Sequence, residues 1–325
     1  MKSVLGMGNA LVDILAVTKD NALLETYKLP KGSMQHVDET TANSIYQNLK
    51  TIGASVVPGG SAANTIAGLS QLGINTGFIG KVGNDELGNL FENTITSLNT
   101  KSFLQRSKET GTGRAMVIIS PDSERTFAVY LGAAIEMVSE DVQPQIFDGY
   151  SYFHIEGYLI QNHKLIETAM KIAKDKNKIV SLDLASYNVV DENLEFLHNI
   201  VEKYADIVFA NEEEAKSFTG KNAREAVDEI SEMCDIAVVK VGSKGSYVKQ
   251  GSNFYEISTK KINPIDLTGA GDIYAAGFLY GLSNGTNIET SAKIGTVAAG
   301  EIIQVIGTKL NQESENRINN FIKNM

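Results

Sequence analysis

The second half of the chain alternates regularly between short apolar stretches and stretches of helical pattern. We expect strands at 152–155, 179–184, 206–210 and 236–241, and helices at 163–174, 193–203 and 288–305. Strands that are separated by helices form β-α-β units, in a parallel sheet whose two faces the helices cover. The sequence therefore predicts an α/β fold with a mostly parallel central sheet.

The first half of the chain is less regular. Its apolar pattern predicts strands within 4–17, 54–58 and 76–79, and helices at 38–49, 65–72 and 85–95. Two further strands, 114–120 and 125–130, flank the turn signal Pro121-Asp122-Ser123-Glu124 and predict a hairpin. Because this hairpin interrupts the helix–strand alternation, we expect it to leave the main sheet and to cover a site.

No feature of the sequence divides the chain into parts. Its 325 residues suffice for one large α/β domain or for two ordinary ones. It contains no internal repeat, low-complexity tract or proline-rich linker. We therefore expect a single domain over 1–325.

Composition limits the class of partner and the compartment. The net charge of −10 argues against binding to nucleic acid or to an anionic membrane. Cys234 is the single cysteine, which excludes an intrachain disulfide, and the four histidines lack the spacing of a metal site. Polar residues interrupt the N-terminal apolar run, and no run is long enough to span a bilayer. We expect a cytoplasmic protein.

The stretch Asp266-Leu267-Thr268-Gly269-Ala270-Gly271-Asp272 leads into small apolar residues that predict a helix. Gly269 and Gly271 permit a turn that exposes backbone N–H groups, and the start of the helix adds its positive dipole end. Asp272 places a carboxylate beside these donors. An anion site next to a potential base is what phosphoryl transfer to a hydroxyl requires. The alternative is an aspartate that only caps the helix.

A second glycine turn, Gly59-Gly60-Ser61-Ala62-Ala63-Asn64, follows a strand and opens another helix of small residues. Adjacent glycines let a ligand approach the backbone closely, although a turn needed only for packing is the alternative. Asp13 is a carboxylate within an apolar strand, where a charge is unusual unless it faces water or a ligand. Gly6-x-Gly8 is not a dinucleotide-binding fingerprint, because Leu11 stands where the third glycine belongs and a strand follows.

Candidate ligand-binding residues also follow predicted strands at their C-terminal ends. Asn211, Gly242 and Asp266 hold this position, and open parallel sheets bind their ligands at that edge. Asn211 and Glu214 share one face at a helix start and could hold a hydrated Mg²⁺. The alternative is a capping box at the start of that helix.

Together these segments resemble the ribokinase or PfkB family of sugar and nucleoside kinases, over nearly the whole chain. Four separate motifs occur in the order of that family, namely Gly59–Asn64, Asn211-Glu212-Glu213-Glu214, Lys240-Val241-Gly242-Ser243-Lys244-Gly245 and Asp266–Asp272. Leu267 departs from the threonine or asparagine that is usual there, but the Gly-Ala-Gly-Asp core is intact. The resemblance implies a ribokinase-like three-layer α/β/α fold with a small β lid, formed by about 15–40 and 102–132.

The resemblance also implies the chemistry. Asp272 is expected to take the proton of the acceptor hydroxyl, while the N–H groups of Gly269, Ala270 and Gly271 stabilise the phosphoryl group that ATP donates. The residues expected beside the nucleotide are Lys240, Gly242, Gly245, Asn211 and Glu214. Of these, Asn211 and Glu214 are expected to hold Mg²⁺ through water. Asp266 and Thr268 match the positions of a monovalent-cation site, which implies K⁺.

The acceptor implied by the resemblance is a small molecule with sugar hydroxyls. The residues expected to bind it are Asn9, Asp13, Gly60, Ser61, Asn64 and Tyr158. Gly8-Asn9-Ala10-Leu11-Val12-Asp13 and Gly157-Tyr158 are most similar to the adenosine kinases, in which an aromatic side chain stacks on the nucleobase. This implies phosphorylation of adenosine by a monomer or homodimer. A ribokinase-like or other carbohydrate kinase is the rival. A non-catalytic nucleotide-binding protein is the third hypothesis, against which the intact Asp272 argues.

Overall fold

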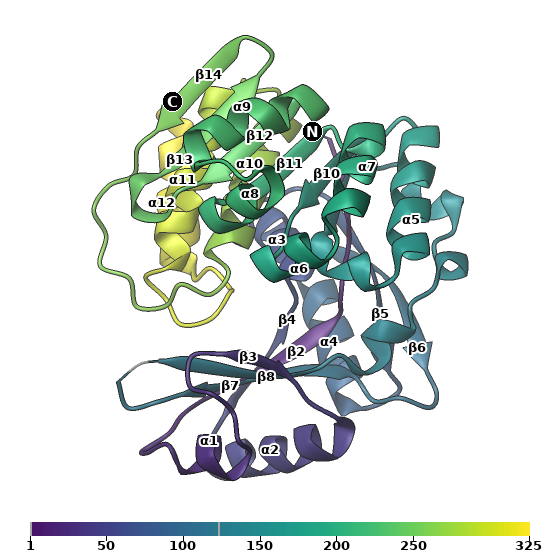
Figure 1. The fold of residues 1–325 in the computed structure, drawn as a ribbon, viewed down its shortest axis with the longest axis vertical. Helices are drawn as coiled ribbons and strands as arrows, with labels where there is room; N and C mark the ends of the chain where they lie inside the picture. The colour runs from purple at the N-terminus through teal and green to yellow at the C-terminus, as the bar shows by residue number, and fades with distance from the viewer. Residues whose placement is uncertain (1, 123) are drawn as a thin grey trace.

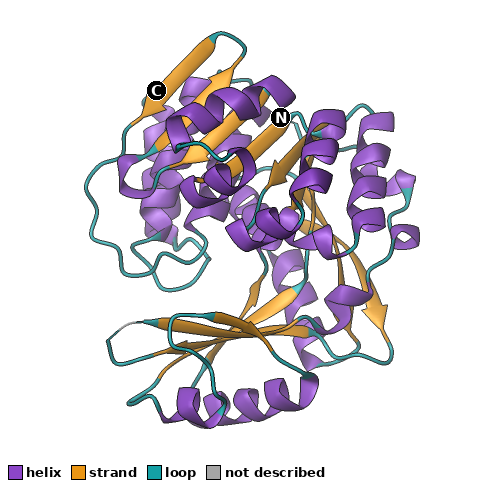
Figure 2. Ribbon diagram, viewed as in Figure 1, coloured by secondary structure: helices purple, strands orange, loops and turns teal. Residues whose placement is uncertain are grey.

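The computed structural model describes residues 2–122 and 124–325, and this part of the chain forms a large and a small β-sheet (Figures 1 and 2). The large sheet has nine strands in the order β14-β13-β12-β11-β10-β9-β1-β5-β6. Their bounds are β1 (Val4–Met7), β5 (Thr76–Gly83), β6 (Thr100–Ser107), β9 (Tyr152–Glu156), β10 (Ile179–Asp183), β11 (Ile207–Asn211), β12 (Ile236–Lys240), β13 (Ser246–Gln250) and β14 (Asn253–Ile257). Adjacent strands from β6 to β12 are parallel, and β12, β13 and β14 pair antiparallel.

Helices cover both faces of the large sheet. One face packs against α3 (Ser61–Gln71), α10 (Ala270–Ser283) and α11 (Ile288–Ile302). The opposite face packs against α5 (His163–Asp175), α7 (Leu194–Tyr204), α8 (Glu212–Thr219) and α9 (Ala223–Met233). Phe209 of β11 packs in the core beneath α3, α10 and α11, whereas its neighbours Val208 and Ala210 pack in the core on the opposite face of the sheet. Burial on both faces explains why these strands are almost wholly apolar, and the predicted three-layer α/β/α fold is confirmed.

The small sheet has five strands in the order β3-β8-β7-β2-β4. They are β2 (Leu11–Val17), β3 (Met34–His36), β4 (Ser55–Gly59), β7 (Gly113–Ile119) and β8 (Arg125–Tyr130). Helix α2 (Glu39–Thr51) packs its buried Ile45 and Leu49 with Ile14 and Met116 on the outer face of this sheet. Figure 1 shows α1 (Ala22–Thr26) and α2 on that outer side, so the other face is turned toward the large sheet.

The predicted hairpin is confirmed, because β7 and β8 pair antiparallel. Ser123 in its turn lies outside the described residues. Two strands depart from the predicted lid of about 15–40 and 102–132. Strand β6 falls largely within those limits but pairs with β5 at the edge of the large sheet, and β4 falls outside them but pairs with β2 in the small sheet. Both sheets contain half-buried strands, so an alternating pattern cannot show to which sheet a strand belongs.

The predicted helices appear within a few residues of their expected limits, including α4 (Glu86–Ser97). Helices and strands that the sequence analysis did not predict are α1, α6 (Tyr187–Glu192), α9, α12 (Gln312–Lys323), β3 and the antiparallel pair β13 and β14. Among the helices that the structure describes, none combines the length and the apolar character needed to cross a bilayer.

Candidate active site

The start of α10 forms one wall of the candidate site. Gly269 precedes the helix in the left-handed region, with φ of 74°. A Cβ at this position would lie 2.8 Å from the methyl group of Thr308, so both the backbone and the space favour glycine. Within the described residues, no side chain caps the helix, and the N–H group of Ala270 makes a 3.3 Å bond to the carbonyl of Leu267. The first turn thus keeps its positive dipole end for a ligand.

Asp272 lies in this first turn and is held by two side chains of α3. Ser61 Oγ donates to Asp272 Oδ1 at 2.7 Å, and Asn64 Nδ2 donates to Asp272 Oδ2 at 2.8 Å. Burial raises the pKa of Asp272 to about 6, although these two hydrogen bonds act in the opposite direction. Gly68 lets α3 approach α10 closely, because a Cβ there would lie 2.8 Å from Ile273. The two predicted glycine turns therefore meet at one carboxylate.

Asp13 reaches the same space from the small sheet. It lies in β2 between Val57 of β4 and Ala115 of β7. Gly59 packs directly on its carboxyl group, since a Cβ at that glycine would lie 2.2 Å from Asp13 Oδ1. Burial, together with the charges of Asp272 and Asp266, raises the pKa of Asp13 to about 7. A carboxylate in this setting favours a ligand that donates hydrogen bonds to it.

Glu156 joins the turn at Gly8-Asn9 to the turn at Gly59–Asn64 and was missed by the sequence analysis. Its Oε1 accepts the N–H of Asn9 at 2.8 Å, and its Oε2 accepts the N–H of Ala62 at 2.7 Å. Burial raises the pKa of Glu156 to about 7, against these two hydrogen bonds. Its position at the end of an apolar strand, just before Gly157, was the signal that could have identified it.

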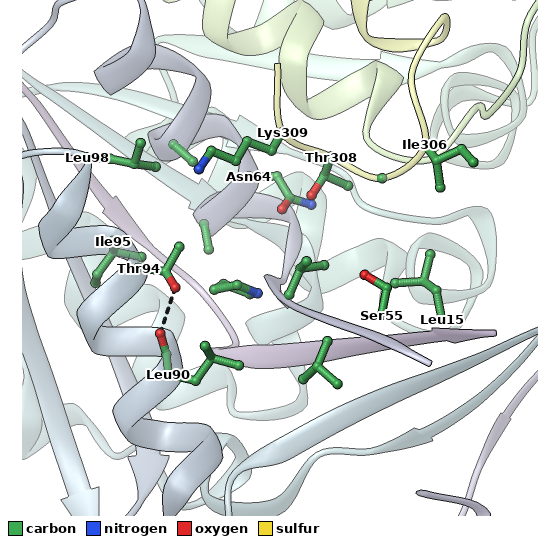
Figure 3. A pocket seen from close by; sticks show the side chains of 16 residues that line it. Leu15, Ser55, Asn64, Leu90, Thr94, Ile95, Leu98, Ile306, Thr308 and Lys309 are labelled. Carbon is green, nitrogen blue, oxygen red and sulfur yellow. Dashed lines mark hydrogen bonds between the residues drawn. The ribbon is translucent and has the colours of Figure 1, made fainter. Parts of the chain in front are cut away.

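Asn64 also borders an apolar cavity of about 220 Å³ behind α3 (Figure 3). Leu90, Thr94 and Ile95 of α4 form one wall, and the 306–309 loop closes the opposite side. Neither Asp13 nor Asp272 lines this cavity, so it lies beside the reacting groups rather than around them.

Tyr158 lies between two other pockets. One, of about 430 Å³, is lined by Asn9, Ala134, Ile135, Met137, Tyr158, Leu159, Gln161, Asn162, His163 and Leu165. The other, of about 500 Å³, contains the start of α10 together with Ser61, Tyr158, Asp183, Ala185, Asn211–Glu214, Lys240 and Gly242. Burial raises the pKa of Tyr158 above its usual range, so its hydroxyl stays protonated at neutral pH.

Asn211 and Glu214 form the capping box that was the alternative to a metal site. Glu214 Oε2 accepts the Asn211 N–H at 2.8 Å, and Glu214 Oε1 accepts Asn211 Nδ2 at 2.6 Å. Both residues nevertheless line the 500 Å³ pocket. Burial and the neighbouring Asp183 raise the pKa of Glu214 to about 7. The capping box therefore holds Asn211 and Glu214 at the pocket wall, where they can still contact a ligand or a metal ion through water.

The predicted nucleotide turn begins where β12 ends. Lys240 Nζ pairs with Asp183 Oδ2 at 2.9 Å. After it, Gly242 and Gly245 adopt positive φ angles of 56° and 106°. A Cβ at Gly245 would lie 1.8 Å from the carbonyl oxygen of Ile257, so only glycine fits this turn. Asp183, at the end of β10, was not among the predicted site residues.

Asp266 and Thr268 contact an arginine rather than leaving an open cation site. Arg125 of the small sheet forms an ion pair with Asp266 and a hydrogen bond with Thr268 Oγ1. The N–H groups of Thr268 and Gly307 also donate to Asp266, at 2.7 and 2.8 Å. Burial would raise the pKa of Asp266, but these contacts hold it below its usual value. A bound K⁺ does not fit this arrangement, because the guanidinium already supplies the positive charge.

The chain belongs to the pfkB family of carbohydrate kinases, because the model of that family matches residues 33–315. The fold is the ribokinase-like fold of these kinases, and the chain is a sugar or nucleoside kinase that uses ATP. A curated relative, the 5-dehydro-2-deoxygluconokinase of Listeria innocua, is 28% identical over 270 residues, which are 78% of this chain and 83% of that protein. An uncharacterised sugar kinase of Archaeoglobus fulgidus is 27% identical and covers 74% of this chain and 96% of its own length.

Two solved structures are similar over 98% of this chain. A probable sugar kinase of Rhizobium etli has a TM-score of 0.89 and 31% identity, with 98% of its own chain covered. The adenosine kinase of Sinorhizobium meliloti has a TM-score of 0.89 and 30% identity, with 99% covered. The structures thus include a nucleoside kinase, whereas the curated relatives above are named as sugar kinases.

Proposed function

We propose that this protein transfers the γ-phosphoryl group of ATP to the primary hydroxyl of a ribose-containing acceptor, most specifically adenosine, and so forms AMP and ADP. The observation that carries the proposal is the position of Asp272. This carboxylate lies in the first turn of α10, beside an uncapped set of backbone donors, and is held by Ser61 and Asn64. A base and an anion site in contact are what this transfer needs.

In the proposed reaction, Asp272 accepts the proton of the acceptor hydroxyl. The hydroxyl oxygen forms its bond to the γ-phosphorus as the bond from that phosphorus to the ADP oxygen breaks. With a pKa of about 6, Asp272 is mainly ionised at neutral pH and can act as the base. The N–H groups of Gly269, Ala270 and Gly271 are proposed to stabilise the charge on the oxygens of the transferring group, with the Ala270 N–H leaving its 3.3 Å bond to Leu267.

Lys240, Gly242 and Gly245 are proposed to lie beside the nucleotide. Asn211 and Glu214 fit a hydrated Mg²⁺, because both line the pocket that also contains the start of α10. Within the described residues, no cluster of three or more acidic, histidine or cysteine side chains could hold a metal alone. A bound Mg²⁺ would neutralise charge on the ATP phosphates.

Adenosine is proposed from the acceptor side of the site. Asp13 of β2 and Asn64 of α3 are proposed to bind the acceptor together, with two ribose hydroxyls donating to the carboxylate of Asp13. Asn9 and Tyr158 line the adjoining pocket, which also contains apolar residues such as Ile135. A tyrosine ring at this position suits a flat nucleobase. The likeness to the adenosine kinase of Sinorhizobium meliloti supports the same acceptor.

A carbohydrate acceptor is the second candidate, favoured by the curated relatives named as 5-dehydro-2-deoxygluconokinases. Asp13 and Asn64 could bind the hydroxyls of a free sugar equally well. A coupled assay of ADP release with adenosine, other nucleosides, ribose and 5-dehydro-2-deoxygluconate tests the proposal. We expect the highest kcat/KM with adenosine. A higher value with a free sugar would overturn the nucleoside assignment, and absence of transfer to every acceptor would overturn the proposed reaction.

A further inference from the structure

The pocket at the start of α10 has an unusual balance of charge. Its lining includes the carboxyl groups of Asp183, Glu214 and Asp272, and Lys240 is its only cationic side chain among the described residues. Such a pocket repels a polyphosphate unless a cation is placed where the phosphate oxygens lie. The position of Lys240 therefore decides how an anionic substrate is received.

The ammonium group of Lys240 lies against the glycine turn that opens α10. A Cβ built on Gly271 would be 3.1 Å from Lys240 Nζ. The lysine reaches this point from the end of β12, and Gly242 and Ser61 line the same pocket. Its ammonium and the N–H groups of the first turn of α10 thus face the same space.

Asp183 holds the ammonium group in this position. Its Oδ2 binds Lys240 Nζ at 2.9 Å, and its Oδ1 accepts the N–H of Ala185 at 3.0 Å. The Asp183 side chain is only 8% exposed, and that of Lys240 14%. Ala185 has a positive φ of 72°, a conformation that a residue with a Cβ rarely adopts. Strain of this kind persists where the surrounding structure enforces it and is frequent at functional sites.

The charges around Lys240 keep it protonated. Burial alone would lower its pKa, but Asp183, Glu214 and Asp272 together raise the pKa above its usual value. A fixed ammonium in a partly dry pocket is a stronger partner for phosphate than an exposed, hydrated lysine.

We propose that Lys240 is a catalytic cation that contacts the oxygens of the transferring phosphoryl group, and that Asp183 is the residue that positions it. The inference rests on the proposed function, because it assigns the charge that assists the same transfer. The contact between the Lys240 ammonium and the phosphoryl oxygens strengthens in the transition state, as charge shifts between the ADP oxygen and the transferring group.

Three variants of the full-length protein separate this role from that of a structural ion pair: Lys240→Met, Asp183→Asn and the double variant. Lys240→Met should lower kcat by roughly 10²–10³-fold. Asp183→Asn should lower it about tenfold, because the charge remains but loses its anchor. The double variant removes the unpaired buried charge, so it should recover thermal stability while kcat stays low. Recovery of wild-type turnover by the double variant would overturn the proposal.

The pair formed by Lys174 and Asp206, at 2.5 Å, is a matched control, because Asp206 directly precedes β11 and so lies at the opposite end of that strand from Asn211. Lys174→Met should change thermal stability without changing kcat.

A binding measurement distinguishes failure of this inference from failure of the proposed function. Calorimetric titrations with ADP and with a non-hydrolysable ATP analogue need no acceptor and no turnover. Lys240→Met should lower the affinity for the analogue about tenfold more than the affinity for ADP. An unchanged ratio of the two affinities would overturn the role of Lys240, whether or not adenosine is the acceptor. If the wild type transfers phosphate to no acceptor, the proposed function fails and this ratio still decides the inference.

Discussion

Replacement of Asp272 by asparagine tests the proposed base directly. The substitution keeps the shape of the side chain and removes its charge. The new amide can accept from Asn64 through its oxygen and donate to Ser61, whose hydroxyl can also accept, so the local geometry should persist. We expect kcat to fall by roughly 10²–10⁴-fold, the usual contribution of a general base.

The pH dependence of the wild type gives an independent measure of the same group. Burial raises the pKa of Asp272 to about 6, and the base must be ionised to act. About nine tenths of this carboxyl group is ionised at pH 7 and about one tenth at pH 5. Activity is therefore present above this pKa and lost as the pH falls through it, and kcat should drop about tenfold between pH 7 and pH 5. Asp272→Asn should lack this acidic limb.

Steady-state ADP release at saturating ATP and acceptor, measured from pH 5 to pH 8, provides the test. Asp148→Asn is a matched control, since this carboxylate pairs at the surface with Lys176, at 2.9 Å. It should retain both the rate and the pH profile. A rate for Asp272→Asn within about threefold of the wild type, or the same acidic limb in both proteins, would refute the assignment.

Four further substitutions are checked by the same kinetic assay. Asp13→Ala should lower kcat/KM for adenosine roughly ten- to a hundredfold with little change in the KM for ATP, and 2′-deoxyadenosine should be a markedly poorer substrate than adenosine for the wild type. Tyr158→Ala should impair a nucleoside acceptor through lost stacking and leave any activity on ribose nearly unchanged; equal loss on both would contradict the stacking role. Glu214→Ala should raise the Mg²⁺ concentration needed for half-maximal rate more than the acceptor KM, and an unchanged Mg²⁺ titration would leave only the capping role. Arg125→Ala should raise the acceptor KM about tenfold, because it removes the ion pair that joins β8 of the small sheet to Asp266 in the segment before α10, whereas an unchanged KM would show that this pair does not hold the small sheet over the acceptor.

The residues that the sequence could identify are those with a strong local signal. Gly269 and Gly60 are backbone signals, because positive φ angles such as their 74° and 95° strongly favour glycine. Asp13 stood out as a charge within an apolar strand. Asn64 and Asp272 are 208 residues apart, and it was the resemblance to the kinase family, rather than a local pattern, that assigned both to one site.

The residues that were missed act through contacts across the fold. Arg125 is an ordinary hairpin residue until the small sheet brings it to Asp266, 141 residues further along the chain. Glu156 binds backbone groups of two separate turns, and side-chain patterns do not reveal such a partner. Asp183 is different, because it ends β10 just as Asn211 ends β11. The rule that ligands bind at the C-terminal edge of parallel strands would have identified it.

The site gathers carboxyl groups that disfavour one another. Asp13, Glu156, Asp272 and Glu214 all have raised pKa values, and burial is the largest cause in each case. Since these groups lose their protons at lower pH in the unfolded chain, they contribute stability at low pH that is lost as the pH rises through their folded pKa values. Hydroxyl groups that donate to Asp13, and a hydrated Mg²⁺ beside Glu214, would relieve this unfavourable charge. The fold therefore holds together carboxyl groups whose charge bound ligands can neutralise, and Lys240 offsets part of that charge beside Glu214 and Asp272.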